Sequence, residues 1–193
     1  VPEAKIPPRR RSPEILILQV VGAQAEREDL RKVNGYELAI VQENDIGMIS
    51  RIHTVSFDDA WSGAMIRRIL AMPGTFGIVA RQSRRWSIAG FALGRIAADE
   101  CEILSIAVAP DHRGAHVGAM LLDGAMHKAA HGGARKLFLE VAEDNDIART
   151  LYDSRGFVPV GRRPDYYARN DGTSAAAVTM SCGLETGGLQ NKA

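Results

Sequence analysis

The sequence has few of the features that mark secreted, membrane or metal-binding proteins. It contains only two cysteines, Cys101 and Cys182, which show neither a disulfide framework nor metal-ligand spacing. We therefore expect two reduced thiols in a reducing compartment. No apolar run reaches the roughly 20 residues that a membrane-spanning helix needs. The five histidines form no ligand pattern, so we expect no metal and no membrane association.

An excess of charge of one sign is also missing. The formal net charge is +1, which gives no general attraction to nucleic acid or to a membrane surface. Hydrophobic residues make up 46% and charged residues 24% of the chain, which is ordinary for a globular protein and argues against extensive disorder. With 193 residues and no internal repeat, one domain is expected.

The first residues resemble a signal peptide only in part. Arginines at 9–11 precede an apolar stretch at 15–21, but prolines lie near the start, Glu14 comes directly before the stretch and Gln19 interrupts it. We expect a cytoplasmic protein with three segments. These are an N-terminal extension, the folded domain and a C-terminal tail, at residues 1–34, 35–184 and 185–193.

Residues 103–122 organise the rest of the chain. A nearly continuous apolar run from Ile103 to Val108 breaks at Pro110, passes through a turn at 111–114 and resumes with helical spacing from Val117. A buried strand, a tight basic turn and a helix with no acid in its first turn can bind an anion, because the first helical amides have no partner within the helix. Phosphate binding stays open at this point, since strand, turn and helix with glycines are common in α/β proteins.

Periodicity and capping residues predict the other elements. Strands are expected at residues 36–41, 75–81, 86–97, 101–109, 135–141, 157–161 and 176–182. Helices are expected after Asn44 or Asp45, from Ser62, from Val117 to about 130 and from Asn145 to about 154. Short links between strands imply antiparallel pairs. The predicted fold is α/β (α+β), a mixed, mostly antiparallel sheet of about seven strands with helices on both faces.

Three side chains in the second half can carry chemistry. Glu140 lies in a strand that is apolar on both sides, so its carboxylate either sits at an open end in water or is held for acid–base work. Asn145 starts the following helix, and Tyr152 can face the sheet in that helix. A tyrosine there is either a core residue or a proton donor.

Several ordered motifs together resemble the GNAT acetyltransferase superfamily, from about Tyr36 to Cys182. Within it the sequence is most similar to the ribosomal-protein-alanine N-acetyltransferases of the RimI type. The matching motifs are R-G-x-x-x-G at 113–118, N-x-x-A-x-x-L-Y-x-x-x-G-F at 145–157, F-D-D-A-W-S at 57–62, S-I-A-V at 105–108, L-E-V at 139–141 and G-R-R-P-x-Y-Y at 161–167.

The resemblance implies a site for acetyl-CoA and assigns a role to each matching residue. Glu140 would be the general base, Tyr152 would protonate the departing thiolate, and Asn145 would complete the cofactor site. The pantetheine arm would bind the backbone of Ile106, Ala107 and Val108. The pyrophosphate would bind Arg113, Gly114, Ala115, His116, Val117, Gly118 and Ala119. The acceptor side would be lined by Phe57, Trp61, Tyr166 and Tyr167, the last two in a loop.

The chemistry of such a site favours a protein N-terminus as acceptor, and a ribosomal protein is one candidate. An α-amine has a pKa of about 7.7–8.0, so neutralising it at pH 7 costs about 1 kcal/mol, against about 4–5 kcal/mol for a lysine. A small amine of the polyamine or aminoglycoside class is an alternative acceptor. A non-catalytic CoA-binding module is a further alternative. It is motivated by His116, where the family has glycine, and by Ala175-Ala176, where the family has an acidic pair.

Overall fold

One mixed sheet of eight strands carries the described part of the chain. The structure is a computed structural model, and it describes residues 32–33, 35–82, 87–168 and 173–184. The strands are β1 (Lys32–Val33), β2 (Tyr36–Ile40), β3 (Thr75–Gln82), β4 (Ile88–Ala97), β5 (Glu100–Val108), β6 (Lys136–Ala142), β7 (Val158–Ala168) and β8 (Ser174–Gly183). The predicted extension at 1–34, except for part of its last residues, and the tail at 185–193 lie outside the described residues.

The order of the strands confirms the predicted mixed, mostly antiparallel sheet. It runs β1-β2-β3-β4-β5-β6-β8-β7. Only β5 and β6 pair in parallel, and every other neighbouring pair is antiparallel. Seven strands match the predicted ones, and the eighth is the two-residue β1, which is too short for periodicity to reveal.

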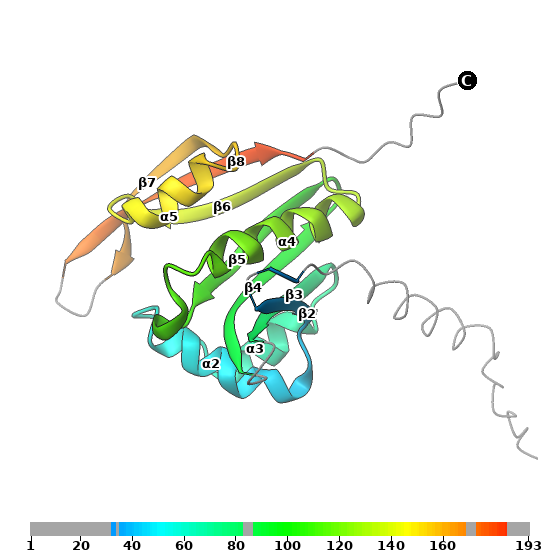
Figure 1. Cartoon of the computed structure of the whole chain (residues 1–193). Coiled ribbons are helices and arrows are strands. Elements are labelled where there is room, and N and C mark those ends of the chain that lie inside the picture. The colour runs from blue at the N-terminus through cyan, green and yellow to red at the C-terminus, as the bar shows by residue number, and fades with distance from the viewer. Residues whose placement is uncertain (1–31, 34, 83–86, 169–172, 185–193) are drawn as a thin grey trace, which may run out of the picture. The chain divides into compact units, whose positions relative to one another are not determined.

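Helices cover both faces of this sheet, as predicted (Figure 1). On one face lie α2 (Ile46–Thr54) and α3 (Gly63–Leu70), and on the other lie α4 (Val117–His131) and α5 (Asp146–Asp153). A Cβ added to Gly118 of α4 would lie 3.5 Å from Leu151 of α5 and 3.6 Å from Val108 of β5. The two helices therefore pack side by side against the sheet where β5 ends.

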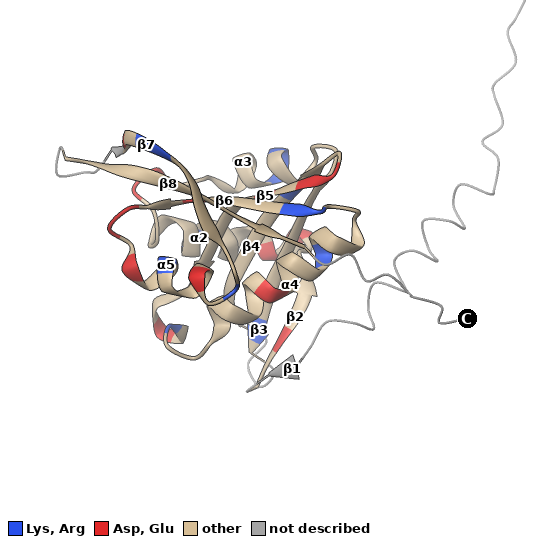
Figure 2. Cartoon of the chain, turned by 90° about the horizontal axis from the view of Figure 1, so that it is seen from above, with Lys and Arg blue, Asp and Glu red and all other residues tan. Residues whose placement is uncertain are grey.

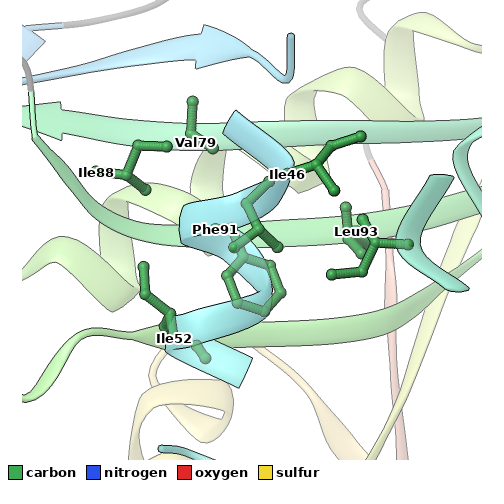
Figure 3. Packing of buried hydrophobic residues seen from close by; sticks show 9 residues of the cluster. Ile46, Ile52, Val79, Ile88, Phe91 and Leu93 are labelled. Atoms are coloured by element: carbon green, nitrogen blue, oxygen red, sulfur yellow. The ribbon is translucent and has the colours of Figure 1, made fainter. Parts of the chain in front are cut away.

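The core between the sheet and α2–α3 is made of aliphatic side chains around one aromatic ring (Figure 3). Phe91 of β4 is fully buried, and Ile46, Ile49 and Ile52 of α2 pack on it at helical spacing. Burying a side chain of this size stabilises the fold by about 1.5–3 kcal/mol. This core fixes α2 and the segment that follows it against the strands.

Side-chain caps explain where two of the helices begin. Ser62 accepts a hydrogen bond from the amide of Met65, and Asn145 accepts one from the amide of Ala148. The predicted cap of α2 is different, because the Asp45 carboxylate does not cap that helix. It accepts hydrogen bonds from the amide of Gln42 and from the guanidinium of Arg81, and so ties the start of α2 to β3.

The predicted loop around Tyr166 and Tyr167 is wrong. Both residues belong to β7, which has 11 residues and continues to Ala168 along β8. Between the pairs Arg163–Ala177 and Tyr167–Ala175 the register shifts, so three residues of β7 oppose one of β8. Pairing with β8 keeps this segment extended, and such pairing between strands is not visible in the local sequence.

Both cysteines are free and buried, as predicted for reduced thiols. Burial raises the pKa of Cys101 to about 12 and that of Cys182 to about 11, so both thiols stay protonated at neutral pH. Among the described residues, no helix combines the length and apolar character needed to cross a membrane.

Candidate active site

The parallel strands β5 and β6 separate halfway along their length. Within the described residues their pairing begins at Glu100 and Lys136 and ends at Ile103 and Leu139. Leu104 has no partner on β4, because the register there jumps from Ser105 to Ile103. Such a bulge bends a strand and increases its twist, so β5 turns away from β6 beyond this residue. The remaining part of β5, at 105–108, keeps its pairing with β4 and leaves its other edge without a strand.

This unpaired edge contains the predicted pantetheine residues Ile106, Ala107 and Val108. The side chain of Ala107 packs in the core on the α2 side, so only its backbone faces the opening between β5 and β6. Next to them, the Ser105 hydroxyl is buried and has no hydrogen-bond partner within the described part of the chain. A strand edge with an unsatisfied buried hydroxyl is a suitable surface for the amides of a pantetheine arm.

The predicted pyrophosphate residues form the turn between β5 and α4. A short 3₁₀ helix at Pro110–His112 is followed by Gly114 with φ 76° and His116 with φ 61°, and α4 begins at Val117. The first turn of α4 carries no acidic residue, so its free amides and the helix dipole favour an anion. The side chain of His116 is exposed to solvent.

Two side-chain hydrogen bonds hold this turn in place. Arg113 donates from Nε to the carbonyl of Val108 at 3.2 Å. The Tyr36 hydroxyl of β2 lies 3.0 Å from Nδ1 of His112. These two hydrogen bonds therefore connect the turn to the end of β5 and to the start of β2.

Glu140 is held in place by two polar partners. Its carboxylate is 19% exposed, lies 3.3 Å from Nε of Arg163, and accepts a hydrogen bond from the hydroxyl of Thr179 at 3.4 Å. The Glu140 side chain is thus mostly buried, and its carboxylate has two polar partners. Glu140 also comes directly after Leu139, the last residue of β6 that pairs with β5, so it lies where these two strands separate.

Strand register shows which face of the sheet carries Glu140. One row of side chains crosses the sheet through Phe76, Gly94, Ile103 and Leu139. Phe76 shares its face with Ile78, whose side chain lies 3.1 Å from a Cβ added to Gly124 of α4. The row therefore faces α4. Because side chains alternate along a strand, Glu140 points to the opposite face, where α2 and α3 lie.

Tyr152 and Asn145 belong to α5, on the α4 side of the sheet. Tyr152 is 5% exposed, and its ring centre lies 5.8 Å from that of Phe157. The side-chain oxygen of Asn145 caps α5. The structure thus places Tyr152 and Glu140 on opposite faces of the sheet.

The residues predicted for the acceptor side fall into two groups. Phe57 and Trp61 flank the buried His53 of α2, with ring centres 4.4 and 4.8 Å from its imidazole. The amide of Trp61 donates to Nδ1 of His53. Burial lowers the pKa of His53, and the charge of Asp59 offsets this only in part, so the imidazole is neutral and accepts this hydrogen bond. His53 was missed as a site residue, since a histidine on an apolar helix face gives no local signal of its contacts.

Tyr166 forms the second group, on β7. It is 47% exposed, and the guanidinium of Arg163 lies 5.3 Å from its ring centre. The side chain of Tyr167 lies outside the described residues. Arg163 was also missed from the sequence, because its contact with Glu140 depends on pairing between strands that no local pattern reveals.

A pocket of about 340 Å³ lies where β6, β7 and β8 meet. Ala175 and Ala176, the residues where an acidic pair was expected, form part of its wall. Carboxylates reach it instead from Glu143, Asp144 and Asp165. Figure 2 shows the acidic residues beside α5 and the basic residues of β7. The guanidinium of Arg162 bonds both oxygens of Glu143, which lowers the pKa of that carboxyl.

Comparison with known proteins identifies similar chains. The model of the acetyltransferase (GNAT) family matches residues 46–157. The [ribosomal protein bS18]-alanine N-acetyltransferase of Haemophilus influenzae is 37% identical over 97 residues, which cover 50% of this chain and 66% of that protein. The N-alpha-acetyltransferase RimI of Mycobacterium tuberculosis is 37% identical over 130 residues, which cover 65% of this chain and 78% of that protein.

Solved structures show the same fold. The crystal structure of the ribosomal-protein-S18-alanine N-acetyltransferase from Escherichia coli superimposes with a TM-score of 0.71 at 24% identity. The match covers 80% of this chain and 97% of the other. The strand order and the helices on both faces described above are therefore shared with a known enzyme fold.

Proposed function

Because the chain belongs to the GNAT family of acetyltransferases and is an acetyl-CoA-dependent N-acetyltransferase, we propose that its acceptor is the N-terminal α-amine of a protein. The similarity to the Mycobacterium tuberculosis N-alpha-acetyltransferase, 37% over 130 residues, carries this proposal. The Haemophilus influenzae relative, named for alanine of ribosomal protein bS18, makes a ribosomal protein a candidate acceptor.

The cofactor site proposed for acetyl-CoA uses the free edge of β5 and the start of α4. The backbone of Ile106–Val108 would bind the pantetheine arm. The amides of residues 114–119, with the guanidinium of Arg113, would bind the pyrophosphate. Asn145 would complete this site. The fit is supported by the partnerless hydroxyl of Ser105 and by the acid-free first turn of α4.

The proposed mechanism is a direct transfer in the opening between β5 and β6. Acetyl-CoA supplies the acetyl thioester. Glu140 takes a proton from the acceptor amine through a water molecule, and Tyr152 donates a proton to the departing sulfur. A carboxylate is a sufficient base here, because an α-amine with a pKa of about 7.7–8.0 costs only about 1 kcal/mol to neutralise at pH 7.

The acceptor would approach from the α2–α3 face, which carries Glu140. Phe57 and Trp61 would form one wall of the peptide entry, and Tyr166 and Tyr167 the other. Tyr166 supports this assignment, since a half-exposed aromatic ring beside Arg163 offers an apolar surface for a peptide.

A panel of acceptors tests the proposed function. The protein is incubated with acetyl-CoA and a peptide with a free N-terminus, a blocked peptide with one lysine, or spermidine, and free thiol is followed. We expect thiol release with the free N-terminus. Release with spermidine alone would contradict the proposal. A small polycation is the second candidate, because the pocket beside β7 is lined by three carboxylates and one guanidinium.

Substitution of the two proposed catalytic residues tests the mechanism. Glu140→Gln keeps an acceptor for Thr179 but removes the base, and Tyr152→Phe removes the proton donor. Each should lower kcat about 10²-fold with little change in the affinity for acetyl-CoA, measured by calorimetry. Glu102→Gln is the matched control, because Glu102 is an exposed carboxylate on the same face of the neighbouring strand β5. Unchanged kcat in both variants would remove them from the mechanism.

A further inference from the structure

Arg163 places a fixed positive charge beside the proposed base. Its Nε lies 3.3 Å from a carboxylate oxygen of Glu140, and its guanidinium lies 5.3 Å from the ring centre of Tyr166. These two contacts hold the Arg163 side chain in place, although 60% of its surface is exposed. An amine that approaches Glu140 from the acceptor face therefore meets the guanidinium as well as the carboxylate.

The neighbouring arginine does not share this position. Arg163 pairs with Ala177 and Arg162 with Val178, so alternation sends the two side chains to opposite faces of the sheet. Ala177 and Val178 pair in turn with Ala142 and Val141 of β6. Ala142 is on the face of Glu140, so of these two arginines it is Arg163 that places its charge there. The guanidinium of Arg162 is bound to Glu143 instead.

We propose that Arg163 makes the enzyme selective for amines that arrive neutral, and that it thereby excludes lysine side chains from the acceptor site. The inference rests on the proposed function, since it concerns the same acceptor amine and the same carboxylate. It names a determinant of acceptor specificity that acts through charge rather than through shape.

The charge states of the two kinds of amine explain the selectivity. At pH 9.0 about nine in ten α-amines are neutral, whereas only about one lysine in twenty-five is. Glu140 alone would attract a lysine ammonium ion, and this attraction would concentrate lysines at the reacting position. A guanidinium 3.3 Å from the carboxylate cancels most of that attraction. A neutral α-amine interacts only weakly with either charge, so Arg163 has little effect on the binding of this amine.

Removal of the charge should therefore relax the specificity. Two peptides of otherwise equal sequence are compared at pH 9.0, one with a free N-terminus and no lysine, the other N-terminally blocked with a single lysine at position 2. In Arg163→Met, kcat/KM for the lysine peptide should rise about fourfold relative to that for the free N-terminus, because at this pH only the lysine peptide is mainly cationic. The rise should come from a lower KM for the lysine peptide. It should shrink in 0.5 M salt, since an exposed interaction is screened.

Three control variants separate charge from structure. Arg163→Lys keeps a cation and should keep the ratio of the wild type. Thr179→Val removes the other partner of Glu140 without a change in charge, and Arg162→Met removes the neighbouring cation from the opposite face. Neither should change the ratio. A ratio that stays constant in Arg163→Met, or that changes as much in any control, overturns the inference.

The same measurement distinguishes this inference from the proposed function. A wild-type enzyme that uses the lysine peptide better than the free N-terminus contradicts the proposed function, and the inference falls with it. A wild-type enzyme that prefers the free N-terminus, with the same preference in Arg163→Met, overturns the inference alone.

Discussion

His116 adopts a left-handed backbone conformation in the turn before α4, although a residue with a side chain disfavours this conformation. Its φ of 61° and ψ of 12° lie in the left-handed region, which costs a residue with a side chain about 1–2 kcal/mol. Histidine is among the residues found there more often than most. The side chain is exposed, so the cost of histidine in this turn is limited to backbone strain.

Replacement of His116 by glycine should therefore stabilise the protein. Relief of the strain outweighs the larger backbone entropy that glycine loses on folding, and we expect a gain of about 0.5–1 kcal/mol in the free energy of unfolding. Urea unfolding measures it. Gly114→Ala is the converse variant: φ is 76° and an added Cβ meets no atom within 4 Å, so only strain is added. A gain in Gly114→Ala, or a loss in His116→Gly, would contradict this account.

His53 makes stability depend on pH. Its pKa is lowered in the folded protein, mainly by burial, whereas in the unfolded chain it is about 6.5. The unfolded state therefore binds a proton more readily, and the stabilisation is fully present above about pH 6.5 and is lost as pH falls toward the lower folded pKa. Urea unfolding should give a free energy that decreases from pH 7 to pH 5.

Two variants isolate this contribution of His53. His53→Phe keeps an aromatic ring among its neighbours but removes the acceptor for the amide of Trp61, so it should lower stability at pH 8 by about 1–3 kcal/mol and flatten the dependence on pH. His131→Gln removes an exposed histidine and should keep the dependence of the wild type. An equal slope in wild type and His53→Phe would exclude His53 as its cause.

At the scale of elements, local signals revealed most helices and strands, and tertiary pairing decided the rest. Ser62 and Asn145 were visible as caps because a cap is made by residues three positions apart. The bulge at Leu104 was not visible, since an extra residue is defined only against the partner strand. The full length of β7 and the contact of Arg163 with Glu140 depend on β8 in the same way. The motifs thus located the candidate site, but not the charge beside its carboxylate.

At the scale of the whole molecule, the chain divides into two units, residues 1–30 and 31–193. All described elements belong to the second unit, whose last described backbone hydrogen bond joins the amide of Leu184 to the carbonyl of Arg135. We propose that this unit, close to the segment 35–184 expected from the sequence, folds and acts by itself.

A truncated chain of residues 31–184 tests this proposal. It contains every described strand and helix, so we expect the same urea midpoint and the same kcat/KM for acetyl-CoA as the full chain, measured side by side. The full chain serves as the reference in both assays. A truncated chain that aggregates or loses its affinity for acetyl-CoA would show that one of the removed segments supports the domain.

The position of β7 at the edge of the sheet has a consequence for self-association. An edge strand of 11 residues can template the addition of a second chain, and Val158 and Val160 are more than half exposed on it. Pro159 and Pro164 offer no amide hydrogen, and the bulge after Arg163 breaks the register that a foreign strand would need. The adjacent residues Arg162 and Arg163 of β7 also carry like charges, which oppose the approach of the same strand from a second copy. The strand proposed to line the acceptor side thus also protects the molecule from edge-to-edge aggregation.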